Sequence, residues 1–175
     1  MNMLRLVLQR SARLPAACLL ACLACPPAQA QDAQFADRIL KTHNEERARL
    51  GIAPLRWNPA LAANAQRWAA HLSTLNVLEH DDSLDVEGEN LWRGSGGAYT
   101  PEDMVTLWID ERVAFRNGVF PDVSASGQWE DVGHYTQVIW RTTGQVGCAL
   151  GEAGEDEVLV CRYMEGGNFE GEKTY

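Results

Sequence analysis

A histidine and a glutamine lie three residues apart within Gly133–Trp140, among aromatic and β-branched residues. If this segment forms a helical turn, His134, Gln137 and Val138 share one face, because positions three and four apart are neighbours on a helix. An imidazole beside an amide can ligate a metal ion or act as an acid or base. The alternative is a core histidine satisfied by one hydrogen bond. The chemistry therefore depends on what lies near His134.

Glu111 is a second candidate. Thr100–Asp103 has a hydroxyl N-cap, a proline at the first helical position and acids in the first turn, which predicts a helix start. Met104, Leu107 and Trp108 mark the expected buried face of that helix. Glu111 falls on the same face, and an unpaired buried carboxylate is costly. We therefore expect Glu111 to be buried and paired.

The first thirty residues read as a secretory signal peptide. Three arginines precede the apolar run Leu14–Cys25, and Ala28–Ala30 supplies small residues for cleavage. The apolar run is short for a bilayer, which disfavours a retained anchor helix. Lipid attachment at Cys25 is the alternative to simple secretion. We expect residues 31–175 to form one exported domain, either extracellular or in the cell envelope, without a membrane span.

The charge of the chain excludes some partners. The 175 residues include 15 basic and 24 acidic side chains, and residues 1–30 contain three of the basic ones and no acid. The mature chain therefore has 12 basic and 24 acidic side chains, a net charge of −12. Such a surface repels nucleic acid and anionic membranes.

We expect the mature chain to be a monomer.

The two remaining cysteines predict a disulfide. Three of the five cysteines leave with the signal, so only Cys148 and Cys161 remain. Gln145–Leu150 and Val158–Tyr163 read as two strands of a hairpin, and folding it about Gly154 places the cysteines opposite each other. A metal-binding cysteine pair is the weaker alternative, because no further cysteine is left.

The other elements follow from apolar spacing and caps. We expect helices over 34–50 and from Pro59 to Leu72, a loop over 74–87, a strand at Gly88–Trp92, and loop or short strand over 116–131. Asn58 is the expected N-cap of the second helix. His43, Asn44 and Arg47 are expected as structural polar groups at the edge of the core. His71 is expected to be exposed.

Several of these segments together resemble the CAP superfamily of cysteine-rich secretory, antigen 5 and pathogenesis-related proteins, also called the SCP domain. They are His43-Asn44 with Arg47, Pro54–Trp57, Gly88–Leu91, Trp108 with Glu111, Gly133–Trp140, Gly147–Ala149, Val160–Tyr163 and Gly167–Asn168. The resemblance covers nearly all of 34–175. It implies an α+β fold, an α-β-α sandwich with a small, mainly antiparallel sheet between helical layers.

The resemblance also implies a central cleft. Its members here would be His80, Glu89, Glu111 and His134, with Gln137 beside them. In related proteins the two histidines can hold a divalent metal such as zinc, with the acids nearby. Neutral imidazoles suit zinc, and carboxylates can complete or orient such a site. The alternative is a hydrogen-bonded network that only fixes the loops.

The resemblance makes us expect a secreted, non-enzymatic protein that binds a sterol, a fatty acid or a cell-surface partner. One rival is a metal-dependent hydrolase in which His80 and His134 hold a metal-bound water and Glu89 or Glu111 acts as general base. Another is a structural envelope protein. Asp81 stands where the family often has serine, which weakens the hydrolase and adds negative charge that could favour a cation.

Overall fold

The computed structural model describes residues 28–75 and 77–175. Its helices are α1 (Ala28–Arg49), α2 (Pro59–Leu72), α3 (Pro101–Asp110) and α4 (Gly133–Val138), with short 3-10 helices η1 (Glu111–Val113) and η2 (Trp129–Val132). Its strands are β1 (Arg56–Trp57), β2 (Gly88–Ser95), β3 (Gln145–Ala153) and β4 (Asp156–Met164). Most of the expected signal peptide and the alternative lipid site at Cys25 lie outside the described residues, so both stay predictions.

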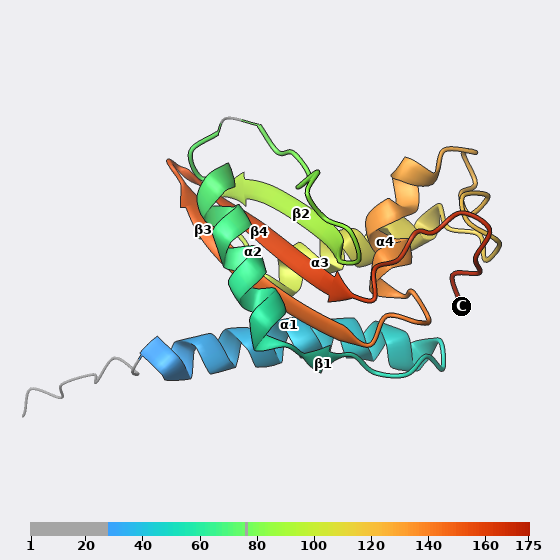
Figure 1. Ribbon diagram of the computed structural model, residues 1–175, viewed down its shortest axis with the longest axis horizontal. Helices are drawn as coiled ribbons and strands as arrows, with labels where there is room; N and C mark the ends of the chain where they lie inside the picture. The colour runs from blue at the N-terminus through green and yellow to red at the C-terminus, as the bar shows by residue number, and fades with distance from the viewer. Residues whose placement is uncertain (1–27, 76) are drawn as a thin grey trace, which may run out of the picture.

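The four strands form one sheet in the order β1-β3-β4-β2 (Figure 1). β3 pairs antiparallel with β4, and β4 pairs antiparallel with β2. The parallel pairing is short, because β1 meets β3 only at Arg56↔Gln145 and Trp57↔Val146. The sheet is therefore mainly antiparallel, as expected. β2 forms one edge, and β3 is the outermost long strand on the other side.

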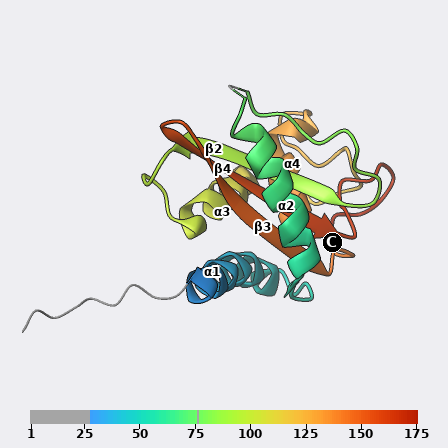
Figure 2. The ribbon, with the colours of Figure 1, turned by 60° about the vertical axis from the view of Figure 1, so that its left-hand side comes forward.

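Helices cover both faces of the sheet (Figure 2). α2 packs on one face, where its alanines and Leu72 meet Leu91, Val158 and Val160. α1 and α3 cover the other face around Ile39, Trp108 and the cysteine pair. This arrangement confirms the α-β-α sandwich. α2 comes so close to β3 that a Cβ on residue 147 would lie 2.3 Å from the backbone nitrogen of Ala62, so glycine is required at 147.

The predicted N-caps of α2 and α3 are confirmed. The Asn58 side chain accepts from the backbone of Ala60 and Leu61, and Thr100 forms a capping box with Asp103. α1 extends from Ala28, six residues before its predicted start. One core assignment is wrong, because Leu107 is 45% exposed. The buried stripe of α3 runs through Met104, Val105, Trp108 and Ile109, which leaves position 107 on the solvent side.

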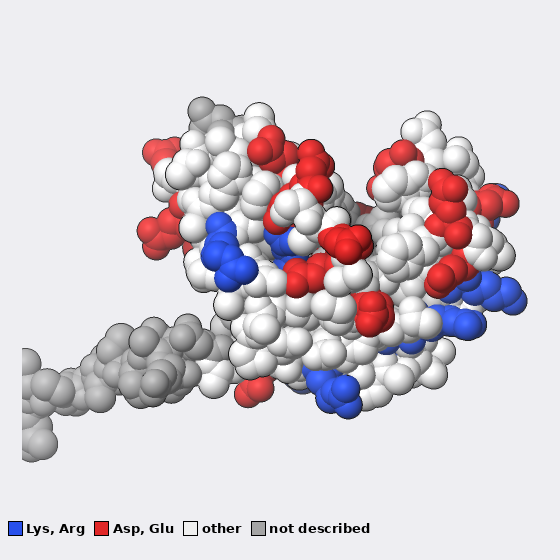
Figure 3. Space-filling view, viewed as in Figure 1, with Lys and Arg blue, Asp and Glu red and all other residues white. Residues whose placement is uncertain are grey.

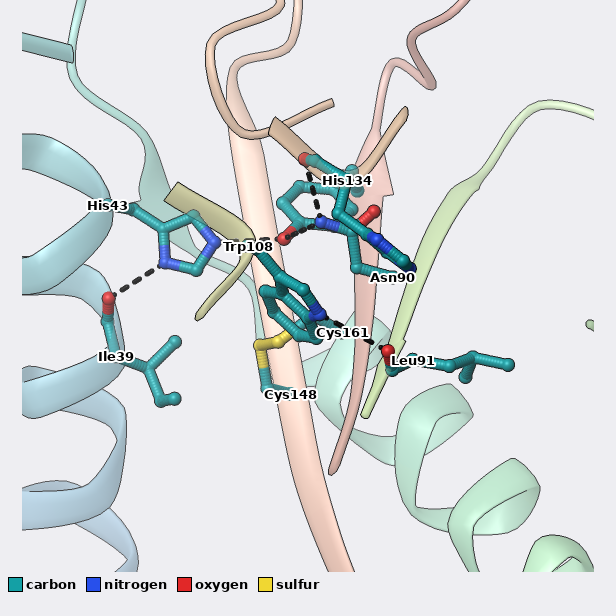
Figure 4. Close-up of a disulfide and its surroundings, with 9 residues drawn as sticks. Ile39, His43, Asn90, Leu91, Trp108, His134, Cys148 and Cys161 are labelled. Atoms are coloured by element: carbon teal, nitrogen blue, oxygen red, sulfur yellow. Dashed lines mark hydrogen bonds between the residues drawn. A yellow bond between two sulfur atoms is a disulfide. The ribbon is translucent and has the colours of Figure 1, made fainter. Parts of the chain in front are cut away.

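The hairpin forms as predicted. Cys148 pairs with Cys161 across β3 and β4, and the two are joined by a disulfide (Figure 4). The bond crosses neighbouring strands on the face covered by α1 and α3. The disulfide closes a loop in the unfolded chain and so lowers the conformational entropy of that chain. For a loop of this length, the chain-entropy model gives a stabilisation of the folded protein of about 3 kcal/mol.

Two polar residues of α1 are buried, which corrects their placement at the edge of the core. His43 and Arg47 are both 0% exposed. The Nδ1 atom of His43 lies 2.9 Å from the carbonyl oxygen of Ile39, and its Nε2 atom lies 2.9 Å from the Tyr163 hydroxyl. Because both ring nitrogens have partners, the neutral imidazole is tolerated inside the core. Burial lowers the pKa of His43 to about 4.

Arg47 is held by backbone carbonyls. Its guanidinium donates to the carbonyl oxygens of Ala53, Val138, Trp140 and Thr143 at distances from 2.8 to 3.0 Å. Burial lowers the pKa of Arg47 to about 10, so the group remains a cation at neutral pH. The cation therefore joins the end of α1 to the segment that follows α4.

Within the described residues, no helix is long and apolar enough to cross a bilayer. This statement does not extend to residues 1–27.

The buried neutral His43 predicts a loss of stability in acid. Its folded pKa of about 4 lies below the unfolded value of 6.5, so its contribution is present above pH 6.5 and is lost as the pH falls towards 4. The full loss is about 3 kcal/mol. Denaturant unfolding of wild type and His43→Phe should show a difference in unfolding free energy that shrinks over this pH range. A difference independent of pH would contradict the burial of a neutral ring.

Arg47→Met should lower the free energy of unfolding by about 3–5 kcal/mol, because four carbonyl groups lose a buried cationic donor. Lys41→Met is the control on the same helix. Its side chain is 72% exposed and pairs only with the exposed Glu45, so its effect should be far smaller. Equal midpoints for the two variants in a urea titration would contradict this role of Arg47.

Candidate metal site

His80 forms the first imidazole–carboxylate pair. It lies in the loop before β2, with its Nδ1 atom 2.7 Å from Oε1 of Glu89. The ring is 62% exposed, whereas the Glu89 side chain is 3% exposed. The hydrogen bond to Glu89 raises the pKa of His80, and burial opposes this only in part. A buried carboxylate thus fixes an accessible imidazole.

His134 forms the second pair. It is the second residue of α4, and its Nδ1 atom lies 2.6 Å from Oε1 of Glu111. The other oxygen of Glu111 accepts from the Tyr135 backbone N–H at 3.0 Å. The ring also stacks on Trp108, with centroids 6.0 Å apart and planes at 16°. Glu111 is therefore paired as expected, but its side chain is 21% exposed and so only partly buried.

Both pairs are tethered to the beginning of β2. Glu89 binds His80, and the next residue, Asn90, donates to the backbone carbonyl of His134 at 3.1 Å (Figure 4). Consecutive side chains of a strand point to opposite faces. The two pairs are therefore held from opposite sides of the same edge strand. Over 28–75 and 77–175, no three His, Cys, Asp or Glu residues form a ready metal cluster.

Gln137 has a different environment from His134, although both belong to α4. It is 2% exposed, its Nε2 atom donates to Thr143 at 3.3 Å, and its Oε1 atom accepts from the Gly167 backbone at 2.8 Å. Its Oε1 atom also occupies the space that a Cβ on residue 88 would need. These contacts fix the C-terminal segment against β2. A role for Gln137 in the cleft stays a prediction.

Arg162 is a site residue that the sequence did not reveal. It lies opposite Glu89 in the β2–β4 register and is 1% exposed. Its Nη2 atom lies 3.0 Å from Oε2 of Glu89 and 2.9 Å from Oδ2 of Asp81. Asp81 also accepts from the backbone and hydroxyl of Ser83. Asp81, whose charge was expected to favour a cation in the cleft, is therefore paired with Arg162. Because the same guanidinium also faces Glu89 and Glu87, it offsets only part of the negative charge there.

Trp108 and Asn90 are also more than core residues. Trp108 was expected only as part of a buried stripe, yet it stacks on His134 and donates its indole N–H to the Leu91 carbonyl at 3.2 Å. Asn90 also donates to the Tyr163 hydroxyl at 3.3 Å. The sequence contained no pattern that predicted the stacking of Trp108 on His134 or the hydrogen bonds of Asn90. Both depend on contacts between distant elements.

The surface has a hollow on the face that carries the loop before β2 and the segment before α4. Figure 3 shows a notch between the lobe formed by α2 with the loop before β2 and the lobe formed by the segment before α4. Acidic side chains lie on both sides of it. A notch bordered by carboxylates favours cations over anions.

The pairs fit metal binding in their donor chemistry. A hydrogen bond from Nδ1–H to a carboxylate leaves the lone pair of each ring at Nε2, and no hydrogen bond within the described residues occupies either Nε2 atom. Neutral Nε2 atoms are common zinc ligands. The carboxylates act here as acceptors for the rings, and solvent or a further ligand would complete the coordination.

The sandwich and its paired imidazoles define the CAP class of domain. A sequence model of the cysteine-rich secretory protein family (CAP) matches residues 40–163, and the chain belongs to this family. The chain is 38% identical over 137 residues to pathogenesis-related protein 1A of Nicotiana tabacum, which covers 78% of each chain. It is 33% identical over 150 residues to pathogenesis-related protein 1 of Arabidopsis thaliana, covering 85% and 86%.

Solved structures share the fold. The crystal structure of NaASP2 with Zn²⁺ superposes with a TM-score of 0.71 at 20% identity, covering 87% of this chain and 90% of that one. The structure of BmVAL-1 gives 0.68 at 22% identity, covering 81% and 82%. These likenesses confirm the fold class.

Glu111→Ala should lower the free energy of unfolding by about 1–2 kcal/mol, because the His134 ring and the Tyr135 N–H both lose their acceptor. Asp110→Ala is the adjacent control, since the Asp110 side chain is 58% exposed and only 3.8 Å from an arginine nitrogen. Urea denaturation of both variants measures the effect. An unchanged midpoint for Glu111→Ala would mean that the pair does not hold α4 in solution.

Proposed function

We propose that this protein is a secreted, non-enzymatic CAP-domain binding protein whose cleft holds a divalent metal ion, such as zinc, through His80 and His134. The observation that supports this most is the matched pair of Nδ1–carboxylate hydrogen bonds, 2.7 and 2.6 Å long. A carboxylate on Nδ1 fixes the ring orientation and makes Nε2 a better ligand. A solved structure with the same fold, NaASP2, contains Zn²⁺, and this supports the proposal that such a domain can bind zinc.

Each residue has a distinct role in this proposal. His80 and His134 bind the ion, and Glu89 and Glu111 orient the two rings. Arg162 holds Glu89 from the neighbouring strand β4, because its guanidinium forms an ion pair with this almost fully buried carboxylate. A bound ion would supply a fixed positive charge that an anionic group of a partner could meet.

The engagement of the acids supports binding over hydrolysis. A general base needs a free carboxylate oxygen near the reacting water. Oε1 of Glu89 accepts from His80, whereas Oε2 has no hydrogen-bond partner but is buried beside Arg162 at 3.0 Å, away from water. Both oxygens of Glu111 accept hydrogen bonds, one from His134 and one from Tyr135. Asp81 has no hydroxyl to act as nucleophile. The described site therefore has no ready base or nucleophile beside the imidazoles.

Export and a disulfide fit an extracellular or cell-envelope protein. The disulfide is present, and the signal peptide remains the prediction that places the chain outside the cytosol. The expected sterol or fatty-acid ligand stays a prediction of the family resemblance. A cell-surface partner is the other expected ligand, and a metal-bearing notch is compatible with it.

Calorimetric titration with zinc tests the metal site. Wild type should bind zinc, and His80→Ala and His134→Ala should each lose most of this binding. His71→Ala is the matched control, because His71 is also exposed beside a carboxylate, 3.7 Å from Glu79. Glu89→Gln and Glu111→Gln should weaken zinc binding by about 10–100-fold through loss of ring orientation.

Equal binding by all five variants would refute the site. Metal-dependent hydrolysis of peptide or ester substrates, present in wild type and lost in both His80→Ala and His134→Ala, would instead establish the hydrolase. Native mass spectrometry of the exported protein would report bound metal and co-purified lipid together.

A further inference from the structure

The outer edge of β3 is open beyond its pairing with β1. The last bond of that ladder runs from the Asn58 backbone N–H to the Val146 carbonyl, 2.9 Å long. The chain then leaves the sheet and enters α2 at Pro59. From Cys148 onward, no described strand lies against this side of β3.

The direction of the backbone groups follows from this bond. The Val146 carbonyl points to the outer edge, and backbone groups of alternate residues in a strand point the same way. Cys148, Leu150 and Glu152 therefore direct their N–H and C=O groups to this side. Cys148 is only 3% exposed, so the accessible part of the edge begins at Leu150. The Cα separation of 4.1 Å between Cys148 and Cys161 agrees, because it is typical of an antiparallel pair that does not exchange hydrogen bonds. No hydrogen bond among the described residues satisfies these outward groups.

An uncharged groove lies along this edge. Its volume is about 470 Å³. Its lining is Phe35, Trp57, Pro59, Ala62, Gln66, Cys148, Ala149 and Leu150, which includes no charged side chain. Phe35 and Trp57 meet edge to face, 6.4 Å apart, and form its aromatic side. The groove thus joins apolar surface to unpaired backbone.

Proteins usually protect exposed strand edges with charges, proline or a covering element. The opposite edge of this sheet has such cover, because the Trp108 indole binds the Leu91 carbonyl of β2. The open edge of β3 has an acidic side chain at Glu152 only, after the groove has ended. This contrast marks the part of the edge that begins at Leu150 as a surface for pairing.

We propose that an extended, uncharged peptide segment of a partner protein binds this groove as an added strand on β3. Strand addition combines backbone hydrogen bonds with pockets for alternate side chains. One set of peptide side chains would meet Phe35, Trp57 and Leu150, and the other would meet the small residues of α2. A lipid chain fills apolar space but leaves the outward N–H and C=O groups without partners. The acidic surface and Glu152 disfavour an acidic peptide. The site is separate from the imidazole pairs, which are tethered to β2 at the other edge of the sheet.

A designed peptide pair tests strand addition directly. The probe is a capped peptide of about six alternating threonine and valine residues, the length of a typical strand. Its control has the same sequence with alternate backbone nitrogens methylated, which removes the donors of one edge. The unmethylated probe should bind at least about tenfold more tightly, because several backbone hydrogen bonds are lost on methylation. It should also slow hydrogen exchange of the Cys148 and Leu150 amides.

Leu150→Glu should weaken the probe by about tenfold or more, because it places a charge in the uncharged groove. Leu107→Glu is the matched control, since Leu107 is 45% exposed on α3 and lies outside the groove. If Leu150→Glu fails to fold, the methylated probe and the exchange rates still decide the question with the wild-type chain.

Three results would overturn the proposal. The first is equal binding of the methylated and unmethylated probes. The second is binding of palmitate, but not of the probe, that is lost in Leu150→Glu, which would make the groove a lipid site. The third is a concentration-dependent dimer that Leu150→Glu abolishes and the probe cannot displace, which would make a second copy of the chain the occupant.

Discussion

The buried guanidinium of Arg47 is the interaction on which the arrangement of the site depends most. It reaches from the last turns of α1 to three carbonyls of the segment 138–143, directly after the helix that carries His134. α4 is only six residues long, too short to be stable by itself. Its position therefore comes from tertiary contacts: Arg47 at its end, Asn90 at its first turn, and Glu111 beneath its imidazole.

β2 is the second constraint, because it connects the two imidazole–carboxylate pairs. Glu89 and Asn90 are neighbours in sequence but face opposite sides of the sheet, so one strand positions His80 and His134 from two directions. Arg162 supports this strand from β4. Since both Nδ1 atoms are engaged by carboxylates, each ring leaves its Nε2 lone pair free of hydrogen bonds within the described residues. This arrangement supports the proposed binding role.

The two edges of the sheet also differ in a way that matters for function. The β2 edge is covered by Trp108 and joined to α4, and it supports the two imidazole–carboxylate pairs of the proposed metal site. The β3 edge is left open because β1 ends after two residues and the chain turns into α2. A small sandwich can thus carry two separate surfaces, one suited to a cation and the other to an extended chain.

The sequence by itself determined the elements whose signals are local. The caps at Asn58 and Thr100, the hairpin about Gly154 and the pairing of Cys148 with Cys161 follow from turn chemistry and spacing, and the structure contains all of them. The family segments also predicted which two histidines and two glutamates belong to the cleft, but the pairing of His80 with Glu89 and of His134 with Glu111 came from the structure. The tertiary structure alone decided that His43 and Arg47 are fully buried, that Leu107 faces solvent, and that Arg162 pairs with both Asp81 and Glu89. These outcomes depend on which distant carbonyls, hydroxyls and carboxylates come within hydrogen-bonding distance, and no local pattern contains that information.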